Sequence, residues 1–308
     1  MIRGFYLTTL FALVLSFATS ASAQVTLKFK FPDGRKSTME VKVKSAQTLT
    51  LAGMDLESGS DQTITLTTTN GKHAADGTIN VTSTTDAVKA AITLPGGTEL
   101  EFDSANPDAY PPGTQFDFVL DIFKATAKAK WTTKIGQNNR VLAVVDREAA
   151  FADLPQNLKD TMKGQLDPEY LKIAANDELD KIPTEPVSVG DSWERTNTLR
   201  LDSGQRFTFT NKFTYQGSVK QNGKTLEKLV SKTTDIEYST EAGAPLKVLE
   251  SNLKIVASSG LILFDVAAGQ VILSRSKMQI KGTIKLEVMG MELPGNLDLT
   301  MESTVTLK

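Results

Sequence analysis

The 308-residue chain contains no cysteine and a single histidine, and its formal net charge is only −2. The absence of cysteine excludes disulfides, thiol chemistry and lipid attachment at a cysteine. Because the net charge is small and no basic residues cluster, the chain offers no surface for nucleic acid. The one histidine, His73, follows Asn70 and Gly71 in a predicted exposed turn. A catalytic Ser/His/Asp triad would therefore have to use the histidine of that turn, and no HExxH zinc motif is present.

Long apolar runs are also scarce. One such block, residues 5–19, follows Arg3 and precedes the small residues Ala21, Ser22 and Ala23. This pattern predicts a signal peptide over residues 1–23, with cleavage leaving Gln24 first. Because no later run of about 20 apolar residues follows, the mature chain is expected in the periplasm or outside the cell, not spanning a membrane.

What the chain has in abundance is period-two alternation of apolar and polar residues, which predicts strands with one buried face. The first predicted strand covers residues 25–31. The last two, 278–288 and 297–307, are the most regular and longer than usual, so a strongly curved sheet is expected. Further short strands are predicted at residues 39–43, 48–51, 63–68, 78–82, 87–94 and 99–102.

A helical period replaces this alternation in the middle of the chain, so three parts are expected after the signal peptide. They are a first β-rich half (24–111), a helical insert with a hairpin (112–182) and a second β-rich half (183–308). The predicted fold is mainly β (α+β), with long curved antiparallel strands in two related halves. The insert should hold helices near 116–123, 153–164 and 167–182, the first capped by Thr114, and a hairpin over 128–145.

Residues 183–194 are predicted to form a hinge between the insert and the second half. Gly190 and Asp191 favour a tight turn, and Trp193 supplies a large apolar side chain directly after it. These three residues are interpreted as a structural turn and its anchor.

Two short stretches look alike. Residues 97–103 and 260–265 share a glycine turn, an apolar strand and a terminal Phe-Asp. We interpret this as a degenerate internal duplication, although β-rich chains also produce such a pattern by chance.

The order of parts, with residues 187–193 between helical insert and second β-rich half, resembles exported bacterial proteins of planctomycete type that are catalogued only as a domain of unknown function. The resemblance implies no catalytic residues. In architecture alone, the chain is also similar to the half-barrel carriers of lipoproteins and lipids, in which a curved antiparallel sheet wraps around helices.

Candidate chemistry is sparse, and neither a cofactor nor a metal is expected. Asp55, Glu57 and Asp61 lie in a predicted Ser/Gly-rich loop, but their spacing lacks the EF-hand glycine and terminal glutamate, so a solvated turn is favoured over calcium binding. Asp103 and Asp265 would form a glycosidase-like carboxylate pair if a twofold axis related the two halves. Asx turns at strand ends are the favoured interpretation of both.

The sequence therefore predicts a non-enzymatic binding or structural protein of the cell envelope; the alternative is a carboxylate-dependent hydrolase of envelope polysaccharide. The partner would be a hydrophobic small molecule, a lipid or an envelope protein, held on a concave sheet face. Packing of the two β halves on each other is favoured over an open groove. The candidate ligand-facing residues share the buried face of the last two strands: Met278, Ile280, Ile284, Leu286, Leu297, Leu299 and Met301.

Overall fold

The computed structural model describes residues 24–109, 116–201, 204–241, 244, 246–288 and 290–308. The predicted signal peptide and the capping residue Thr114 lie outside these residues. Within them, twelve strands form one antiparallel sheet, as the predicted fold class requires. The strands are β1 (Lys36–Leu51), β2 (Met54–Asn70), β3 (Ile79–Thr93), β4 (Glu99–Asp103), β5 (Lys130–Ile135), β6 (Val141–Val145), β7 (Ser192–Arg200), β8 (Gln205–Gln221), β9 (Lys224–Thr240), β10 (Leu246–Asp265), β11 (Gln270–Val288) and β12 (Met291–Leu307).

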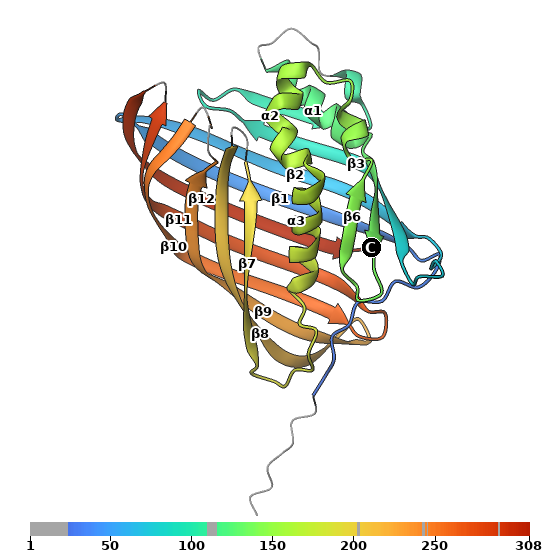
Figure 1. The fold of residues 1–308 in the computed structure, drawn as a ribbon. Coiled ribbons are helices and arrows are strands. Elements are labelled where there is room, and N and C mark those ends of the chain that lie inside the picture. Colours follow the sequence, from blue (N-terminus) through green and yellow to red (C-terminus); the bar gives the residue numbers. More distant parts are fainter. Residues whose placement is uncertain (1–23, 110–115, 202–203, 242–243, 245, 289) are drawn as a thin grey trace, which may run out of the picture.

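The strand order is β6-β5-β3-β2-β1-β12-β11-β10-β9-β8-β7, with β4 paired to β3. Strands β1 and β12 therefore meet in the middle of the sheet, and their pairing joins the two β-rich ranges. Figure 1 shows the sheet curling so that its edge strands, β6 and β7, lie on either side of helix α3 (Pro168–Asp180).

The two predicted strands 278–288 and 297–307 lie within β11 and β12, which pair with each other. Met278 lies opposite Met301, and Ile280 lies opposite Leu299. Residues that face each other across two strands point to the same side of a sheet, so these apolar side chains share the concave face. The polar positions between them form ion pairs on the convex face, Lys277 with Glu302 at 2.7 Å and Lys281 with Asp298 at 2.8 Å.

Two glycines allow these long strands to lie close to their neighbours. A Cβ at Gly282 would lie 2.1 Å from the carbonyl oxygen of Asn252, and one at Gly295 would lie 2.4 Å from that of Thr50. Backbone oxygens cannot move aside as a flexible side chain can. Glycine is thus required at both positions, because the neighbouring backbone lies too close for a side chain.

Helix α3 satisfies backbone groups of both edge strands. The side chain of Asn176 accepts a hydrogen bond from Val141 N (2.9 Å) and donates one to Val141 O (3.0 Å) on β6. On β7, the hydroxyl of Tyr170 accepts from Arg200 N (3.1 Å) and donates to Thr198 O (3.5 Å). Side chains of one helix thereby replace the partners that each edge strand lacks, which protects both edges from pairing with other chains.

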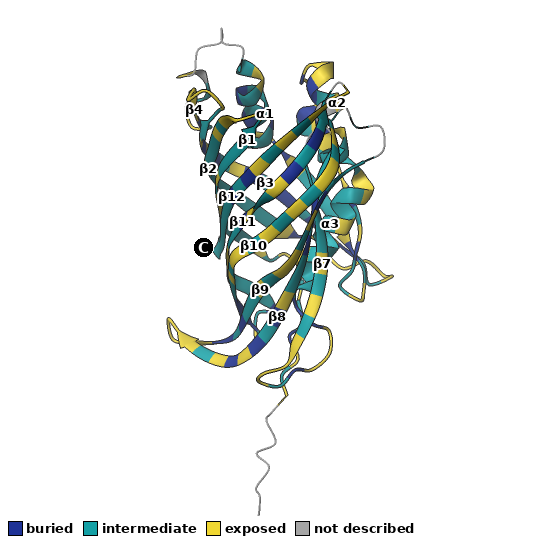
Figure 2. Ribbon diagram, turned by 90° about the vertical axis from the view of Figure 1, so that its left-hand side faces the viewer, coloured by how far each residue is buried: buried dark blue, intermediate teal, exposed yellow. Residues whose placement is uncertain are grey.

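The other two helices cover the end of the concave face near β3. Leu120 and Phe123 of α1 (Asp117–Ala127) pack against Val88 and Phe102 of the sheet. Helix α2 (Gln156–Leu166) packs against α1 and the short 3-10 helix Glu148–Phe151 through Leu158 and its neighbours. Figure 2 shows buried residues on the strands that these helices cover. In the described part of the chain, no helix is long and apolar enough to cross a membrane.

The three predicted helices are present, but their boundaries differ from the predicted ones by up to four residues. Asp167 accepts a hydrogen bond from Tyr170 N at 2.8 Å, which caps α3 where the Asp-Pro pair predicted its start. The predicted stop at Gly164 is wrong, because α2 continues to Leu166. A glycine inside a helix costs about 1 kcal/mol, which neighbouring packing readily offsets.

Four of the predicted short strands are parts of two longer ones. Residues 39–43 and 48–51 belong to the single strand β1, and residues 78–82 and 87–94 to β3. The predicted gaps hold polar residues, among them Ser45 and Gln47 in β1 and Ser83 and Thr85 in β3, which interrupt the apolar alternation without ending the strand.

Residues 24–35, called here the N-terminal segment, are not a strand of the sheet, contrary to the prediction for 25–31. Val25 forms an isolated bridge with Val187, and Lys30 N donates to Gly269 O at 3.0 Å. Asn139 Nδ2 donates to Phe29 O at 2.9 Å. The alternation was real, since Leu27 is only 2% exposed, but the segment crosses one end of the curled sheet instead of joining it.

Candidate functional site

The space between the curled sheet and α3 is not completely filled. A cavity of about 620 Å³, called here the interior cavity, is lined by the C-terminal end of α3 and by residues of β1 and β7–β12. It lies between two apolar clusters of the concave face. The Phe264 cluster contains Leu27, Ile182, Val187, Phe213, Tyr215, Leu229, Ile262 and Phe264, and the Ile280 cluster contains Phe207, Phe209, Tyr238, Ile280, Ile284, Leu286, Leu297 and Leu299.

Small side chains in the middle of the concave face leave this space open. In register across β9, β10, β11 and β12 stand Ser231, Gly260, Ser276 and Ser303, called here the small-residue row. Ser276 remains exposed although it points inward. On either side of the row the sheet carries large side chains, so the cavity follows from a local shortage of side-chain volume.

One wall of the interior cavity is a chain of hydrogen-bonded polar groups. Asn211 Nδ2 donates to Asn197 Oδ1 at 2.9 Å, and Thr233 Oγ1 donates to Asn211 Oδ1 at 2.9 Å. Thr233 N in turn donates to Ser258 Oγ at 2.8 Å. Since Phe209, Met278, Met301 and other apolar side chains line the rest of the cavity, it presents both polar and apolar surface.

The helix side of the cavity is acidic. Burial raises the pKa of the Asp177 carboxyl, and the neighbouring carboxylates of Asp180 and Glu178 raise it further. Arg195 Nε donates to the backbone oxygen of Asp180 at 2.9 Å, and Arg140 pairs with the Asp180 side chain. These contacts fix the C-terminal end of α3 against the sheet edges.

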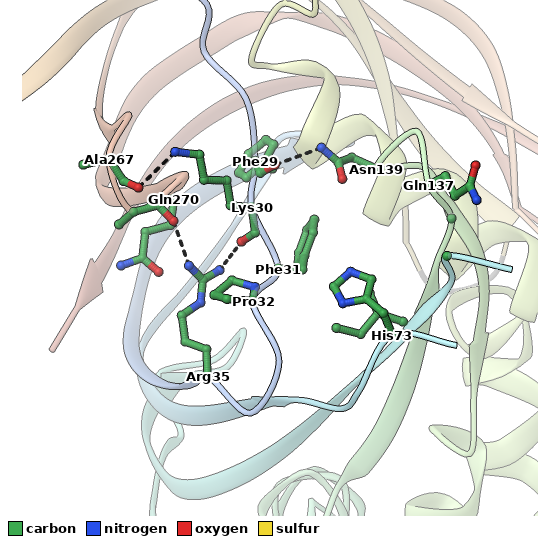
Figure 3. Close-up of a pocket in the computed structure, with 14 residues that line it drawn as sticks. Phe29, Lys30, Phe31, Pro32, Arg35, His73, Gln137, Asn139, Ala267 and Gln270 are labelled. Atoms are coloured by element: carbon green, nitrogen blue, oxygen red, sulfur yellow. Dashed lines mark hydrogen bonds between the residues drawn. The ribbon is translucent and has the colours of Figure 1, made fainter. Parts of the chain in front are cut away.

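A second space, the outer pocket, lies where the N-terminal segment crosses the end of the sheet (Figure 3). Its volume is about 580 Å³, and its walls include Phe29, Phe31, Arg35 and His73. Phe29 also lines the interior cavity, so this one half-buried side chain borders both spaces. Its ring packs edge-on against Phe264, with the ring centres 5.4 Å apart.

His73 lies in an exposed loop, as predicted, and its contacts are local. Its Nδ1 and backbone N both contact Asp33 Oδ1, at 2.6 and 3.1 Å. These hydrogen bonds hold the pKa of the Asp33 carboxyl below its usual value. The histidine thus has a structural partner, and the pair is open to solvent, with about half of each side chain exposed.

The structure separates the seven predicted ligand-facing residues into two groups. Met278 and Met301 line the interior cavity. The other five, Ile280, Ile284, Leu286, Leu297 and Leu299, are buried in the Ile280 cluster and contact other apolar side chains.

The predicted turn and anchor also have defined contacts. Gly190 has φ +97°, a conformation that favours glycine, and Asp191 Oδ2 accepts from Ser188 N at 2.8 Å. Trp193 stacks on Phe213, with the ring centres 6.1 Å apart, and its Nε1 donates to Lys181 O at 3.2 Å.

The predicted acidic candidates are not brought together. Asp103 Oδ1 accepts from Ala105 N at 2.9 Å and Asp265 Oδ1 from Ala268 N at 2.9 Å, the local turn contacts that were favoured. Asp103 ends β4, beside β3, and Asp265 ends β10, with four strands between β3 and β10 in the sheet.

The loop predicted around Asp55, Glu57 and Asp61 is wrong, because all three lie within β2. In the described part of the chain, no group of three or more acidic or histidine side chains is arranged to hold a metal ion.

The sequence reading missed the small-residue row, although a signal was present. Ser276 and Ser303 stand in phase with the apolar residues of the last two strands and interrupt their stripes. A small polar residue at an inward position marks either a defect in packing or a space kept open.

With this geometry in view, the chain can be compared with known proteins. A model of a family of unknown function, DUF6263, matches residues 76–262. The chain belongs to this family. The DUF6263 match covers all three helices and most strands that line the interior cavity, and it confirms the predicted resemblance to a domain of unknown function. A search of curated proteins finds no match.

Among solved structures, a lipovitellin structure described by its lipid-protein interactions is similar at 11% identity and a TM-score of 0.44. The similarity covers 91% of this chain but only 25% of the lipovitellin chain. A putative exported protein with a YmcC-like fold from Bacteroides fragilis is similar at 7% identity and a TM-score of 0.20, over 89% of this chain and 98% of that one. These scores are too low to transfer a function.

Proposed function

We propose that the chain is an exported, non-enzymatic binding protein of the cell envelope that holds a small hydrophobic or amphipathic molecule in the interior cavity. The supporting observation is the cavity itself, about 620 Å³ between the sheet and α3. Cavities of roughly 300–1,000 Å³ with mostly apolar walls and a few placed polar groups are typical of small-molecule sites. Met278 and Met301 would contact the apolar part of the ligand.

The polar wall limits what such a ligand can be. Asn197, Asn211, Thr233 and Ser258 supply hydrogen-bonding groups on one side of the cavity. A ligand without any polar atom would cover these groups and leave their remaining hydrogen-bonding capacity unused, which is unfavourable. An amphipathic ligand is therefore favoured over a pure hydrocarbon.

Uptake of the neutral fluorescent probe N-phenyl-1-naphthylamine tests the proposal. Wild-type protein is expected to bind it saturably at micromolar concentration. Ser276→Leu and Ser303→Leu fill the cavity from adjacent strands and should weaken binding at least tenfold. Thr225→Leu is the matched control, since Thr225 is exposed on β9 and does not line the interior cavity. Absence of saturable uptake by folded wild-type protein, or equal binding by all three variants, would refute the proposal.

Export is tested separately by the intact mass of the protein recovered outside the cytoplasm. The predicted signal peptide leads us to expect a chain beginning at Gln24, with or without cyclisation of that glutamine. A mass that includes residues 1–23, recovered from the membrane fraction, would contradict this part of the proposal.

A further inference from the structure

We propose that the outer pocket binds the anionic head group of the ligand whose apolar part occupies the interior cavity, with Lys30 and Arg35 as the residues that recognise the anion. This inference rests on the proposed function and names the ligand class: a single-chain amphiphile that ends in a carboxylate or a phosphate.

The two spaces are neighbours, separated by one side chain. Phe29 borders the interior cavity on one side and the outer pocket on the other. It belongs to the N-terminal segment, which is attached by individual hydrogen bonds and by an isolated bridge instead of a strand ladder. A ligand chain that passes the Phe29 ring from the outer pocket would therefore enter the interior cavity, which Met278 and Met301 also line.

Two positive charges stand at the outer pocket without a carboxylate within 4.0 Å among the described residues. Lys30 Nζ donates to Val266 O at 2.9 Å. It also donates to Ala267 O at 3.1 Å (Figure 3). Arg35 Nη1 donates to Ala268 O at 2.8 Å, and Nη2 donates to Lys30 O. Carbonyl oxygens satisfy the donors but leave the net charge of both groups uncompensated.

The nearby carboxylates already have partners. Asp33 is hydrogen-bonded to His73, and Asp265 accepts from Ala268 N and lies 3.8 Å from Lys224 Nζ. The same turn that carries Asp265 thus presents its carbonyl oxygens to Lys30 and Arg35. Because these hydrogen bonds fix both cations at one wall, an arriving anion would meet a charge pair that needs little rearrangement.

Desolvation lowers the pKa of the Arg35 guanidinium, so Arg35 is also partly withdrawn from water. A partly desolvated cation gains more from a counter-ion than a fully hydrated one does. The pocket volume of about 580 Å³ accommodates either head group, and aromatic walls at Phe29 and Phe31 suit the first methylenes that follow it.

Displacement of N-phenyl-1-naphthylamine by three ligands of equal chain length tests the assignment: dodecanoate, dodecyl phosphate and dodecanol, each below its critical micelle concentration. In wild-type protein at low salt, the better of the two anions should displace the probe at about one fifth of the concentration that dodecanol needs. A fivefold preference is near the largest that an exposed ion pair provides. The preference should shrink in 0.5 M salt, about the ionic strength at which such pairs are screened. The ranking of dodecanoate against dodecyl phosphate distinguishes the two head groups.

Lys30→Gln and Arg35→Lys separate charge from structure. In Lys30→Gln, dodecanol should need only about one to two times the anion concentration to displace the probe. Arg35→Lys keeps the charge and should retain most of the preference for the anion. Lys28→Gln is the matched control, because Lys28 is an exposed lysine of the same segment that does not line the pocket. Two outcomes would overturn this inference alone, provided that the probe is taken up. One is an equal preference for anions over dodecanol in Lys30→Gln and Lys28→Gln. The other is the absence of any such preference in wild-type protein. Absence of probe uptake would overturn the proposed function, and this inference with it.

Discussion

Replacing Asn176 by alanine removes the two hydrogen bonds through which α3 covers the edge strand β6. Both partners are backbone groups of Val141, a residue that is only 5% exposed. Each such hydrogen bond contributes about 0.5–1.5 kcal/mol net, so the loss of two amounts to about 1–3 kcal/mol. Alanine regains up to about 0.7 kcal/mol through its higher helix propensity. The expected decrease in the free energy of unfolding is therefore about 1–2 kcal/mol.

Urea unfolding followed by tryptophan fluorescence measures this change, since Trp131 lies on β5, next to the edge strand β6, and Trp193 lies on β7 at the opposite edge. The slope of the free energy with urea should stay constant while the midpoint falls. Asn176→Asp keeps the acceptor for Val141 N but loses the donor, so an intermediate value is expected. Ile173→Ala, on the same helix at a side chain that is 52% exposed, should change stability by no more than about 0.5 kcal/mol.

If Asn176→Ala is as stable as Ile173→Ala, α3 does not protect β6 through this side chain. If Asn176→Asp is also as stable as Ile173→Ala, then placing a negative charge beside the backbone oxygen of Val141 has no effect on stability either. A larger loss than about 3 kcal/mol, with a changed slope, would instead show that α3 leaves the sheet altogether.

Three further predictions follow from positions described above. Gly282→Ala should destabilise the protein by about 1–3 kcal/mol in thermal unfolding, because its Cβ would meet the Asn252 backbone; unchanged stability would contradict the close approach. Burial raises the pKa of Tyr215 and Tyr238 to about 12, so both contribute stability that is complete below about pH 10 and is lost as the pH rises through 12. Ultraviolet absorbance should show two tyrosine hydroxyls that ionise well above pH 10. Ionisation of all tyrosines near pH 10 in folded protein would refute the prediction of raised pKa values. Trp193→Ala should cost about 2–3 kcal/mol in urea unfolding, less than a fully buried tryptophan, and a loss below 1 kcal/mol would show that it is no anchor.

The sequence predicts best where one face of a strand is continuously apolar. In residues 278–288 and 297–307 the alternation is regular enough to predict which residues share the buried face, although it does not predict the register that places Met278 opposite Met301. It predicts poorly where inward positions are polar. Polar residues at those positions, Ser45 and Gln47 in β1 and Ser83 and Thr85 in β3, interrupt the apolar alternation, which is why each strand was divided in two.

Alternation also does not reveal a strand's partner. Residues 25–31 alternate like a strand, and Leu27 is buried like one, but their backbone meets a turn at Gly269 and the side chain of Asn139. The closure of the sheet by Asn176 and Tyr170 is equally invisible, because both residues act on backbone groups far away in sequence. The internal duplication and the division into three parts stay predictions.

The pairing of β1 with β12 in the middle of the sheet imposes an order on folding. On one side residues 39–51 pair with β2, which follows in sequence, but on the other side they pair with residues 295–307. Nearly the whole chain must therefore be synthesised before the two sides of the sheet can join. Contacts this distant in sequence form slowly, because the intervening chain must first lose its freedom to close the loop. Until then β1 and β11 are both open edges, long and rich in backbone groups seeking partners. A nascent chain that lacks β12 is therefore the species most exposed to aggregation, and the one on which a chaperone would act.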